Sequence, residues 1–205
     1  MASAFLLASA LAFASPTGNP GSWMSDNDYP AGALKRREEG TVGFQLLIAP
    51  KGRVARCTVT DTSGSPDLDA ATCAVIMDHS KFKPATDATG QPSYTLYKGR
   101  LTWHLPGRSG PFRSKQPAPP LPTMVLTVQK LPDGSREKMV WLIASFDAAG
   151  QMTACEPSPN NPKEVRLATV ACTEAKAVST EITKDNDGNP IPLVRGLSVL
   201  FKATE

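Results

Sequence analysis

Four cysteines are the residues in this sequence whose type and spacing most clearly indicate chemistry. Cys57 and Cys73 lie in the first half of the chain, and Cys155 and Cys172 have nearly the same spacing in the second half. Neither pair shows the Cys-x-x-Cys spacing or the neighbouring histidine of a zinc site. Two disulfides are therefore the favoured interpretation, with free thiols or a single metal site as the alternatives.

A repeat around these cysteines indicates how they pair. The segment Gly52–Cys73 reads GRVARCTVTDTSGSPDLDAATC, and Gly150–Cys172 repeats its plan about 98 residues later. If each copy carries its own bond, the pairs are Cys57–Cys73 and Cys155–Cys172. Each bond closes a loop of about 16 residues and stabilises its domain by roughly 3 kcal/mol.

The remaining reactive side chains form no convincing catalytic set. His79 and His104 have no serine or cysteine nearby in a nucleophile context. Asp67 and Asp69 stand where a helix begins, and acidic residues there favour the positive end of the helix dipole. The run Asp185–Gly188 lacks the glutamate that completes a calcium loop. We predict that the chain is no enzyme and needs no metal or cofactor.

The N-terminus has the composition of a secretory signal. Residues 2–14 read ASAFLLASALAFA, an apolar stretch that ends in small residues, although no Lys or Arg precedes it. A signal peptide at 1–14, a flexible lead at 15–27 and a periplasmic mature protein are predicted. Contact with a membrane is expected only if further residues lie upstream and the segment is an uncleaved anchor.

Hydrophobic periodicity and turn residues divide the rest into two domains. For residues 28–105 we expect a β-β-α-β order, in which Ser65 caps the helix and Pro66 takes its first position. Leu68, Ala71, Thr72, Val75 and Ile76 form the apolar stripe of that helix. The expected elements are a short helix at 31–37, strands from 40, at 53–60 and at 93–105, and the main helix at 66–80.

A connector at 106–123 contains six prolines and precedes the second domain, 124–205. The net charge of +3 lies largely on this connector, which excludes a nucleic-acid face. An extra strand at 125–130 is expected to form a hairpin with 138–143 around Pro132–Gly134. The other predicted elements are strands at 139–146, 151–156 and 193–202, and a helix at 164–180.

Six short motifs follow one another in the first domain: Tyr29-Pro30, Gly40-Thr41-Val42, Pro50-Lys51-Gly52-Arg53-Val54, Ser63-Gly64 with Leu68-Asp69, Phe82-Lys83-Pro84-Ala85 and Gly90-Gln91-Pro92. In these motifs and their order, residues 29–105 resemble the C-terminal domain of TonB-type energy transducers. The second domain keeps the turn glycine, the cysteines and a Gly188-Asn189-Pro190 turn, so it is interpreted as a divergent copy. The fold class expected from the resemblance is α+β, two tandem TonB-like units, each a small antiparallel sheet packed on one helix. The matching positions are Tyr29, Pro30, Gly52, Ser63, Gly64, Leu68, Asp69, Phe82, Pro84, Gly90 and Pro92.

The resemblance implies a protein partner. Domains of this family bind an extended peptide of an outer-membrane TonB-dependent transporter by adding it as a strand to their sheet. The long strand 93–105 is the candidate edge, unless the other domain or the connector covers it. The side chains expected to meet the partner are Tyr94, Leu96, Lys98 and Arg100. Because domains of this family exchange or pair strands, a homodimer is also compatible with the resemblance.

The chain departs from the family at its N-terminus. Family transducers have a membrane helix and a long proline-rich spacer, whereas here the apolar segment is short and lies close to the first domain. We therefore predict a periplasmic binding protein, possessing two disulfides, rather than a transducer of energy. The alternatives are a true transducer whose start lies upstream and a thiol redox protein.

Overall fold

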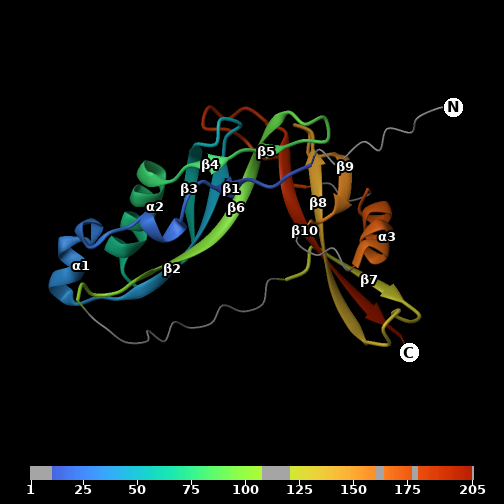
Figure 1. Ribbon diagram of the computed structural model, residues 1–205, viewed down its shortest axis with the longest axis horizontal. Coiled ribbons are helices and arrows are strands. Elements are labelled where there is room, and N and C mark those ends of the chain that lie inside the picture. The colour runs from blue at the N-terminus through green and yellow to red at the C-terminus, as the bar shows by residue number, and fades with distance from the viewer. Residues whose placement is uncertain (1–10, 108–120, 160–163, 177–179, 205) are drawn as a thin grey trace. The chain divides into compact units, whose positions relative to one another are not determined.

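The computed structural model describes residues 11–107, 121–159, 164–176 and 180–204 (Figure 1). Most of the predicted signal peptide and of the predicted connector lies outside these residues. The chain divides into two compact units. We call Ala14–Pro84 with Tyr94–Ala118 the first unit, and Met1–Phe13 with Ala85–Ser93 and Pro119–Glu205 the second unit.

The first unit contains an antiparallel sheet in the strand order β3-β2-β6. Its strands are β2 (Gly40–Ile48), β3 (Val54–Asp61) and β6 (Pro92–Trp103), and helix α2 (Pro66–His79) follows β3. Strands and helix lie where the hydrophobic pattern predicts them. In Figure 1 α2 lies beside β3.

The core of the first unit lies between α2 and the sheet. Leu68, Thr72, Val75 and Ile76 of the predicted stripe are buried, and they point to the face of the sheet that carries Trp103. The Trp103 Nε1–H donates to Thr72 Oγ1 at 2.8 Å. This bond joins the helix to the last strand inside an apolar core.

Residues 15–27, predicted to be a flexible lead, contain short elements of structure. Strand β1 (Ser15–Pro16) pairs with β4 (Phe82–Lys83), and the 3-10 helices η1 (Pro20–Ser22) and η2 (Asp26–Asp28) follow. The physical reason is Trp23, which is 6% exposed and packs on the ring of Phe82 at 5.6 Å. Helix α1 (Ala31–Arg36) comes next, as predicted.

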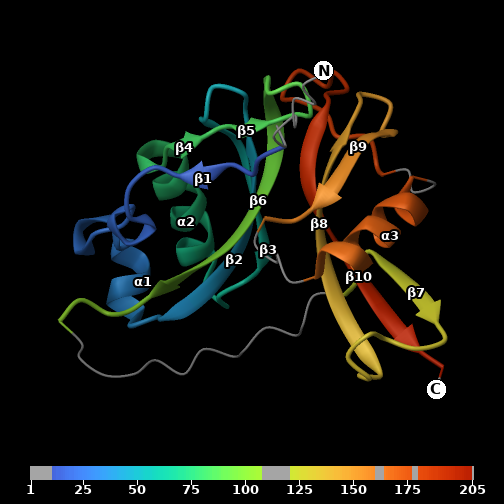
Figure 2. The same ribbon diagram turned by 45° about the vertical axis from the view of Figure 1, so that its right-hand side comes forward.

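The second unit contains a sheet in the order β9-β8-β10, also antiparallel. Its strands are β8 (Glu137–Phe146), β9 (Met152–Pro157) and β10 (Leu193–Ala203). Helix α3 (Val165–Ala175) contacts β8 and β9 and covers one face of this sheet (Figure 2). A short β5 (Ala85–Thr86) pairs with Pro92 and Ser93 at the start of β6.

One strand of the second unit pairs differently from the prediction. Strand β7 (Met124–Val128) is not in a hairpin with β8; it runs parallel to β10, with Met124 opposite Val199. Leu131, 1% exposed, lies in the core, so the connection from β7 to β8 is held across the end of the sheet. Strand β8 pairs with β10 along its whole length, and β7 lies against Val199–Ala203 of β10.

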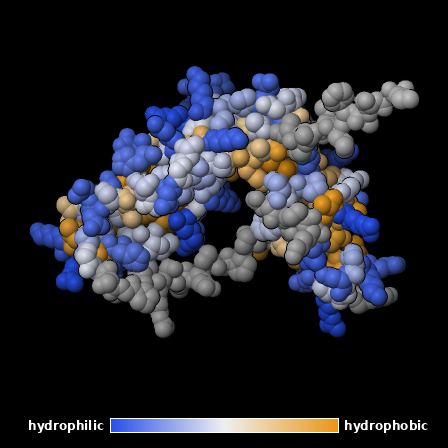
Figure 3. All heavy atoms as spheres, in the orientation of Figure 1, coloured by the Kyte–Doolittle hydropathy of each residue, from blue (hydrophilic) through white to orange (hydrophobic). Residues whose placement is uncertain are grey.

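Some apolar side chains remain exposed on the helices. Figure 3 shows apolar surface over α3, where Val165 and Val170 are each 50% exposed. Scattered exposed apolar residues are ordinary in globular proteins. No helix among the described residues has both the length and the apolar character needed to span a bilayer.

Candidate functional site

The candidate binding strand, β6, has two different faces. Side chains alternate along a strand, and Tyr97, Leu101 and Trp103 point to the face that packs on α2. The opposite face carries the four predicted contact residues, of which Lys98 and Arg100 are exposed and Tyr94 and Leu96 are half-buried. The four side chains therefore share one face, while their role in binding stays a prediction.

An ion pair spans the sheet on that polar face. Arg100 Nη1 lies 3.4 Å from Asp61 Oδ2, and Gly43 of β2 stands between them in register with both. A Cβ atom on Gly43 would overlap the Asp61 carboxylate. The missing side chain thus lets a cation on β6 reach an anion on β3.

The motif residues that resemble the TonB C-terminal family mainly stabilise turns and contacts between segments. Gly52 has a φ of 73°, and a Cβ atom there would overlap the carbonyl oxygen of Phe82. The backbone N–H of Phe82 donates to the Gly52 carbonyl at 2.9 Å. The turn glycine and the segment from Phe82 to Pro84 are therefore parts of one contact.

The Ser63–Asp69 motif builds the entrance to α2. Ser65 caps the helix, and its hydroxyl accepts from the Leu68 N–H. Asp69 accepts hydrogen bonds from the backbone N–H and the hydroxyl of Ser63, and from the Thr62 hydroxyl. Desolvation raises the pKa of Asp69, but these hydrogen bonds outweigh it and hold the pKa below its usual value.

Tyr29 belongs to the core of the first unit, and the half-buried Pro30 follows it. The ring of Tyr29 meets Trp103 edge-on, with centroids 5.4 Å apart, and its hydroxyl donates to the Glu38 carbonyl. Burial raises the pKa of this hydroxyl. Pro30 stands at the start of α1. The motif thus anchors α1 on the last strand.

The turn before β6 is closed by an aspartate. Asp87 Oδ1 accepts from the backbone N–H groups of Thr89 and Gln91, and Gly90 has a φ of 80°. Only glycine adopts this conformation without strain. Pro92 then begins β6, where a missing N–H is tolerated.

Both cysteine pairs form disulfides, as the repeat predicts. Cys57 of β3 bonds to Cys73 of α2, and Cys155 of β9 bonds to Cys172 of α3, each with Cα atoms 5.5 Å apart. Neither pair leaves a free thiol. Each bond ties a helix to the end strand of its own sheet.

Among the described residues no group of His, Cys, Asp and Glu side chains is placed to hold a metal ion. His79 Nδ1 lies 2.7 Å from the Trp23 carbonyl oxygen, and this hydrogen bond raises the pKa of His79 above its usual value. This hydrogen bond holds the segment at residues 15–27 against the C-terminal end of α2.

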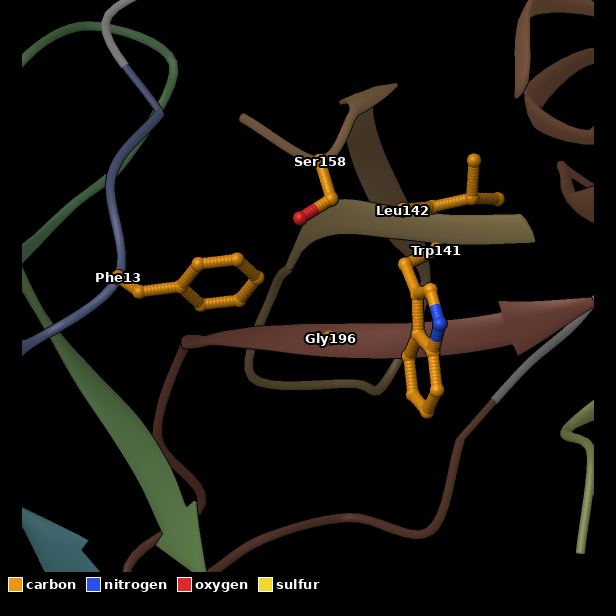
Figure 4. Close-up of a pocket in the computed structure, with 5 residues that line it drawn as sticks. All are labelled: Phe13, Trp141, Leu142, Ser158 and Gly196. Atoms are coloured by element: carbon orange, nitrogen blue, oxygen red, sulfur yellow. The ribbon is translucent and has the colours of Figure 1, made fainter. Parts of the chain in front are cut away.

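The second unit has a cavity that the sequence interpretation missed. Its volume is about 350 Å³, and it is lined by Phe13, Trp141, Leu142, Ser158 and Gly196 (Figure 4). Figure 4 shows the ring of Phe13 pointing toward Trp141, with Gly196 between them. The sequence contained one signal for this cavity, a strand with apolar residues on both faces. That strand is β8, and its Trp141 lies on the face that points away from α3.

A second cavity, of about 320 Å³, lies between β9 and α3. It is lined by Met152, Thr153, Ala154, Cys155, Thr169, Cys172, Thr173 and Lys176. The hydroxyls of Thr153, Thr169 and Thr173 are all used in hydrogen bonds to backbone carbonyls. This cavity therefore offers few polar groups to a ligand.

Comparison with known proteins identifies one part of the chain. Residues 25–105 match the family model of the Gram-negative bacterial TonB protein C-terminal. No curated protein and no solved structure matches the chain. The matched segment contains the motif positions described above, and it ends two residues beyond β6. The match supports the TonB C-terminal family for residues 25–105.

Proposed function

We propose that this chain is a protein-binding module of the periplasm, without enzymatic activity, that recognises an extended segment of an envelope protein. The family match at residues 25–105 carries this proposal, since TonB C-terminal domains act by contacting other envelope proteins. An outer-membrane TonB-dependent transporter is the partner class that the family suggests. The predicted leader at residues 1–14 would supply export.

Strand addition along β6 is the proposed mode of binding. The strand has 12 residues, and β2 pairs with it from Thr95 to Trp103. Within the first unit, taken by itself, β6 ends the order β3-β2-β6, so a strand added there would gain main-chain hydrogen bonds and, from alternate side chains, specificity. Lys98 would favour a partner with an acidic side chain on the same face, whereas Arg100 is already paired with Asp61.

We further propose that the second unit is a divergent copy of the first. Strand register supports this. Leu46 of β2 pairs with Cys57 of β3. Ala144 of β8 pairs with Cys155 of β9, so both partners are shifted by 98 residues. The hairpins also share an irregularity, because the register slips after Leu47 in one and after Ser145 in the other.

The turns support the same duplication. As described above, the N–H of Phe82 donates to the Gly52 carbonyl. In the second unit the N–H of Thr180 donates to the Gly150 carbonyl, again 98 residues later. A Cβ atom on Gly150 would lie 2.5 Å from the Thr180 carbonyl oxygen. A fourfold coincidence of turn, register, helix and disulfide is what duplication of one unit produces.

Site-specific photocrosslinking tests the binding mode. A photoreactive phenylalanine analogue replaces Lys98 on β6 or, in the matched control, Thr58 on β3. Both positions are exposed and both stand opposite Gln45 of β2, on either side of it. The probe is a synthetic peptide from the periplasmic N-terminus of a TonB-dependent transporter. We expect an adduct at position 98 and little or none at position 58.

Each other outcome contradicts part of the proposal. An adduct only at position 58 would move the binding edge to β3. A crosslink from position 98 to another part of the same chain would show that the chain itself covers β6. The absence of any adduct at both positions would reject strand addition to this sheet.

A further inference from the structure

A short segment near the N-terminus lines the cavity of the second unit and pairs with Thr86 as an added peptide strand would. The backbone N–H of Ala12 donates to the Thr86 carbonyl at 3.1 Å, and the Thr86 N–H donates back to Ala12 at 3.0 Å. Residues 11–13 thus extend along β5 in antiparallel pairing. The neighbouring Leu11 is only 5% exposed, although it lies at the edge of the described chain.

The side chain of Phe13 forms one wall of the cavity described above and points toward Gly196 and Trp141 (Figure 4). Gly196 forms part of its floor, and a Cβ atom there would lie 3.6 Å from two carbon atoms of the Phe13 ring. Trp141 forms the far wall and remains 41% exposed. The backbone N–H of Ser158 donates to the Trp141 carbonyl at 3.0 Å, which holds the upper wall in place.

These features select an aromatic side chain. The Phe13 ring lies over a floor that has no side chain, at Gly196, and the indole of Trp141 lines the same cavity on the other side of Gly196 (Figure 4). Beside the slot, the main chain of Thr86 provides one donor and one acceptor for an extended backbone. The site therefore combines main-chain pairing with one specificity pocket.

We propose that this slot is a docking site for an extended segment of a partner protein that carries an aromatic residue in the pattern Leu-x-Phe. The chain's own residues 11–13 lie where the partner segment would bind. The predicted leader ends at Ala14, so its removal would take Phe13 away and open the slot to the partner. This site lies in the second unit and does not depend on strand addition at β6.

A labelled peptide and full-length variants test the proposal. The probe is the fluorescein-labelled peptide Ser-Ala-Leu-Ala-Phe-Ala-Ser, which copies residues 9–15. Phe13→Ala removes the native ring from the slot in the full chain, while the pairing of Ala12 with Thr86 remains for the probe to displace, and fluorescence anisotropy measures binding. We expect this variant to bind the probe at least tenfold more tightly than the wild type does. A probe with alanine in place of phenylalanine should lose that gain.

Two further substitutions locate the binding. In the Phe13→Ala background, Gly196→Leu should fill the slot and Trp141→Ala should remove its wall, each weakening binding at least tenfold. Gly196→Ala is the matched control, because a Cβ atom at this position makes only ordinary contacts. Equal binding of the phenylalanine and alanine probes, or unchanged binding in the Gly196→Leu variant, would overturn the proposal.

A second measurement avoids reliance on the Phe13→Ala variant. In the otherwise wild-type chain, Gly196→Leu should expel Phe13, so chymotrypsin should cleave after Phe13 at least tenfold faster than in the wild type or in Gly196→Ala. Unchanged cleavage would show that the slot does not hold residue 13. If the wild type is a dimer and the Phe13→Ala variant is not, the slot binds a second copy of this chain. That result would overturn the proposal of a different partner protein.

Discussion

Two glycines, one in the β2–β3 turn and one in the loop before α2, show how single residues hold the first unit together. Gly52 and Gly64 both have positive φ angles, 73° and 93°. Only Gly52 also touches another segment, since a Cβ atom on Gly64 would meet nothing within 4 Å. Comparing substitutions at the two positions therefore separates the free-energy cost of the positive φ angle from the cost of a steric clash.

Gly52→Ala should destabilise the protein more than Gly64→Ala. The Gly64 variant is destabilised only by the unfavourable φ angle, by about 1 kcal/mol. The Gly52 variant must also displace the Phe82 carbonyl, and we expect a loss of about 3 kcal/mol or more. Urea denaturation followed by circular dichroism measures both values. Equal losses would mean that the contact between Gly52 and Phe82 is not tight.

His79 makes stability depend on pH. Its folded-state pKa is raised by the hydrogen bond to the Trp23 carbonyl, above an unfolded value of about 6.5. A raised pKa means that the stabilising contribution is complete below about pH 6.5 and is lost as the pH rises through the folded-state pKa. The difference in unfolding free energy between wild type and His79→Gln should therefore be larger at pH 5.5 than at pH 8.5. A difference that grows toward high pH would contradict this assignment.

At the scale of elements, each sheet is tied to its helix by buried contacts. In the first unit these include the disulfide from β3 and the hydrogen bond between Trp103 of β6 and Thr72 of α2. Trp103 and Thr72 are both fully buried. An unpaired polar group at that depth loses its hydration without replacement.

Thr72→Val and Thr72→Ser form a matched pair that isolates this hydrogen bond. Valine keeps the shape but removes the acceptor for the Trp103 Nε1–H, which should cost about 1–3 kcal/mol. Serine keeps the hydroxyl and loses one methyl group, at a cost of about 1 kcal/mol. Equilibrium unfolding gives both values. A valine variant as stable as the wild type would show that the bond between helix and strand adds nothing.

At the scale of the whole molecule, two bodies each carry one disulfide. The bonds close loops of 16 and 17 residues, for which the chain-entropy estimate is about 3 kcal/mol each. Neither bond shares a residue with the other unit. Independent units should therefore respond to the loss of their own bond.

Replacing one pair of cysteines by alanine should destabilise one unit by about 3 kcal/mol, and replacing both pairs should give additive losses. Trp103 reports on the first unit and Trp141 on the second, so single-tryptophan variants follow the two transitions by fluorescence. If Cys57→Ala/Cys73→Ala shifted the Trp141 transition as much as the Trp103 transition, the two units would unfold as one cooperative body.

The sequence by itself determined the local parts of this protein. Ser65 and Pro66 begin α2 because cap and first-turn preferences act within a few residues, and the spacing of the repeat was enough to pair Cys57 with Cys73. The alternation along β6 likewise predicted which of its side chains face the core.

Only the tertiary structure decided which distant segments of the chain pair and pack with one another. The sequence predicted a hairpin of β7 with its neighbour, but β7 pairs in parallel with Val199–Ala203 of β10, and Leu131, which follows it, is buried. The slot that holds Phe13 was also missed, because its walls come from residues far apart in the chain. Pairing of edges and formation of cavities depend on which nonlocal contacts are available in the folded chain, and hydrophobic periodicity carries no information about them.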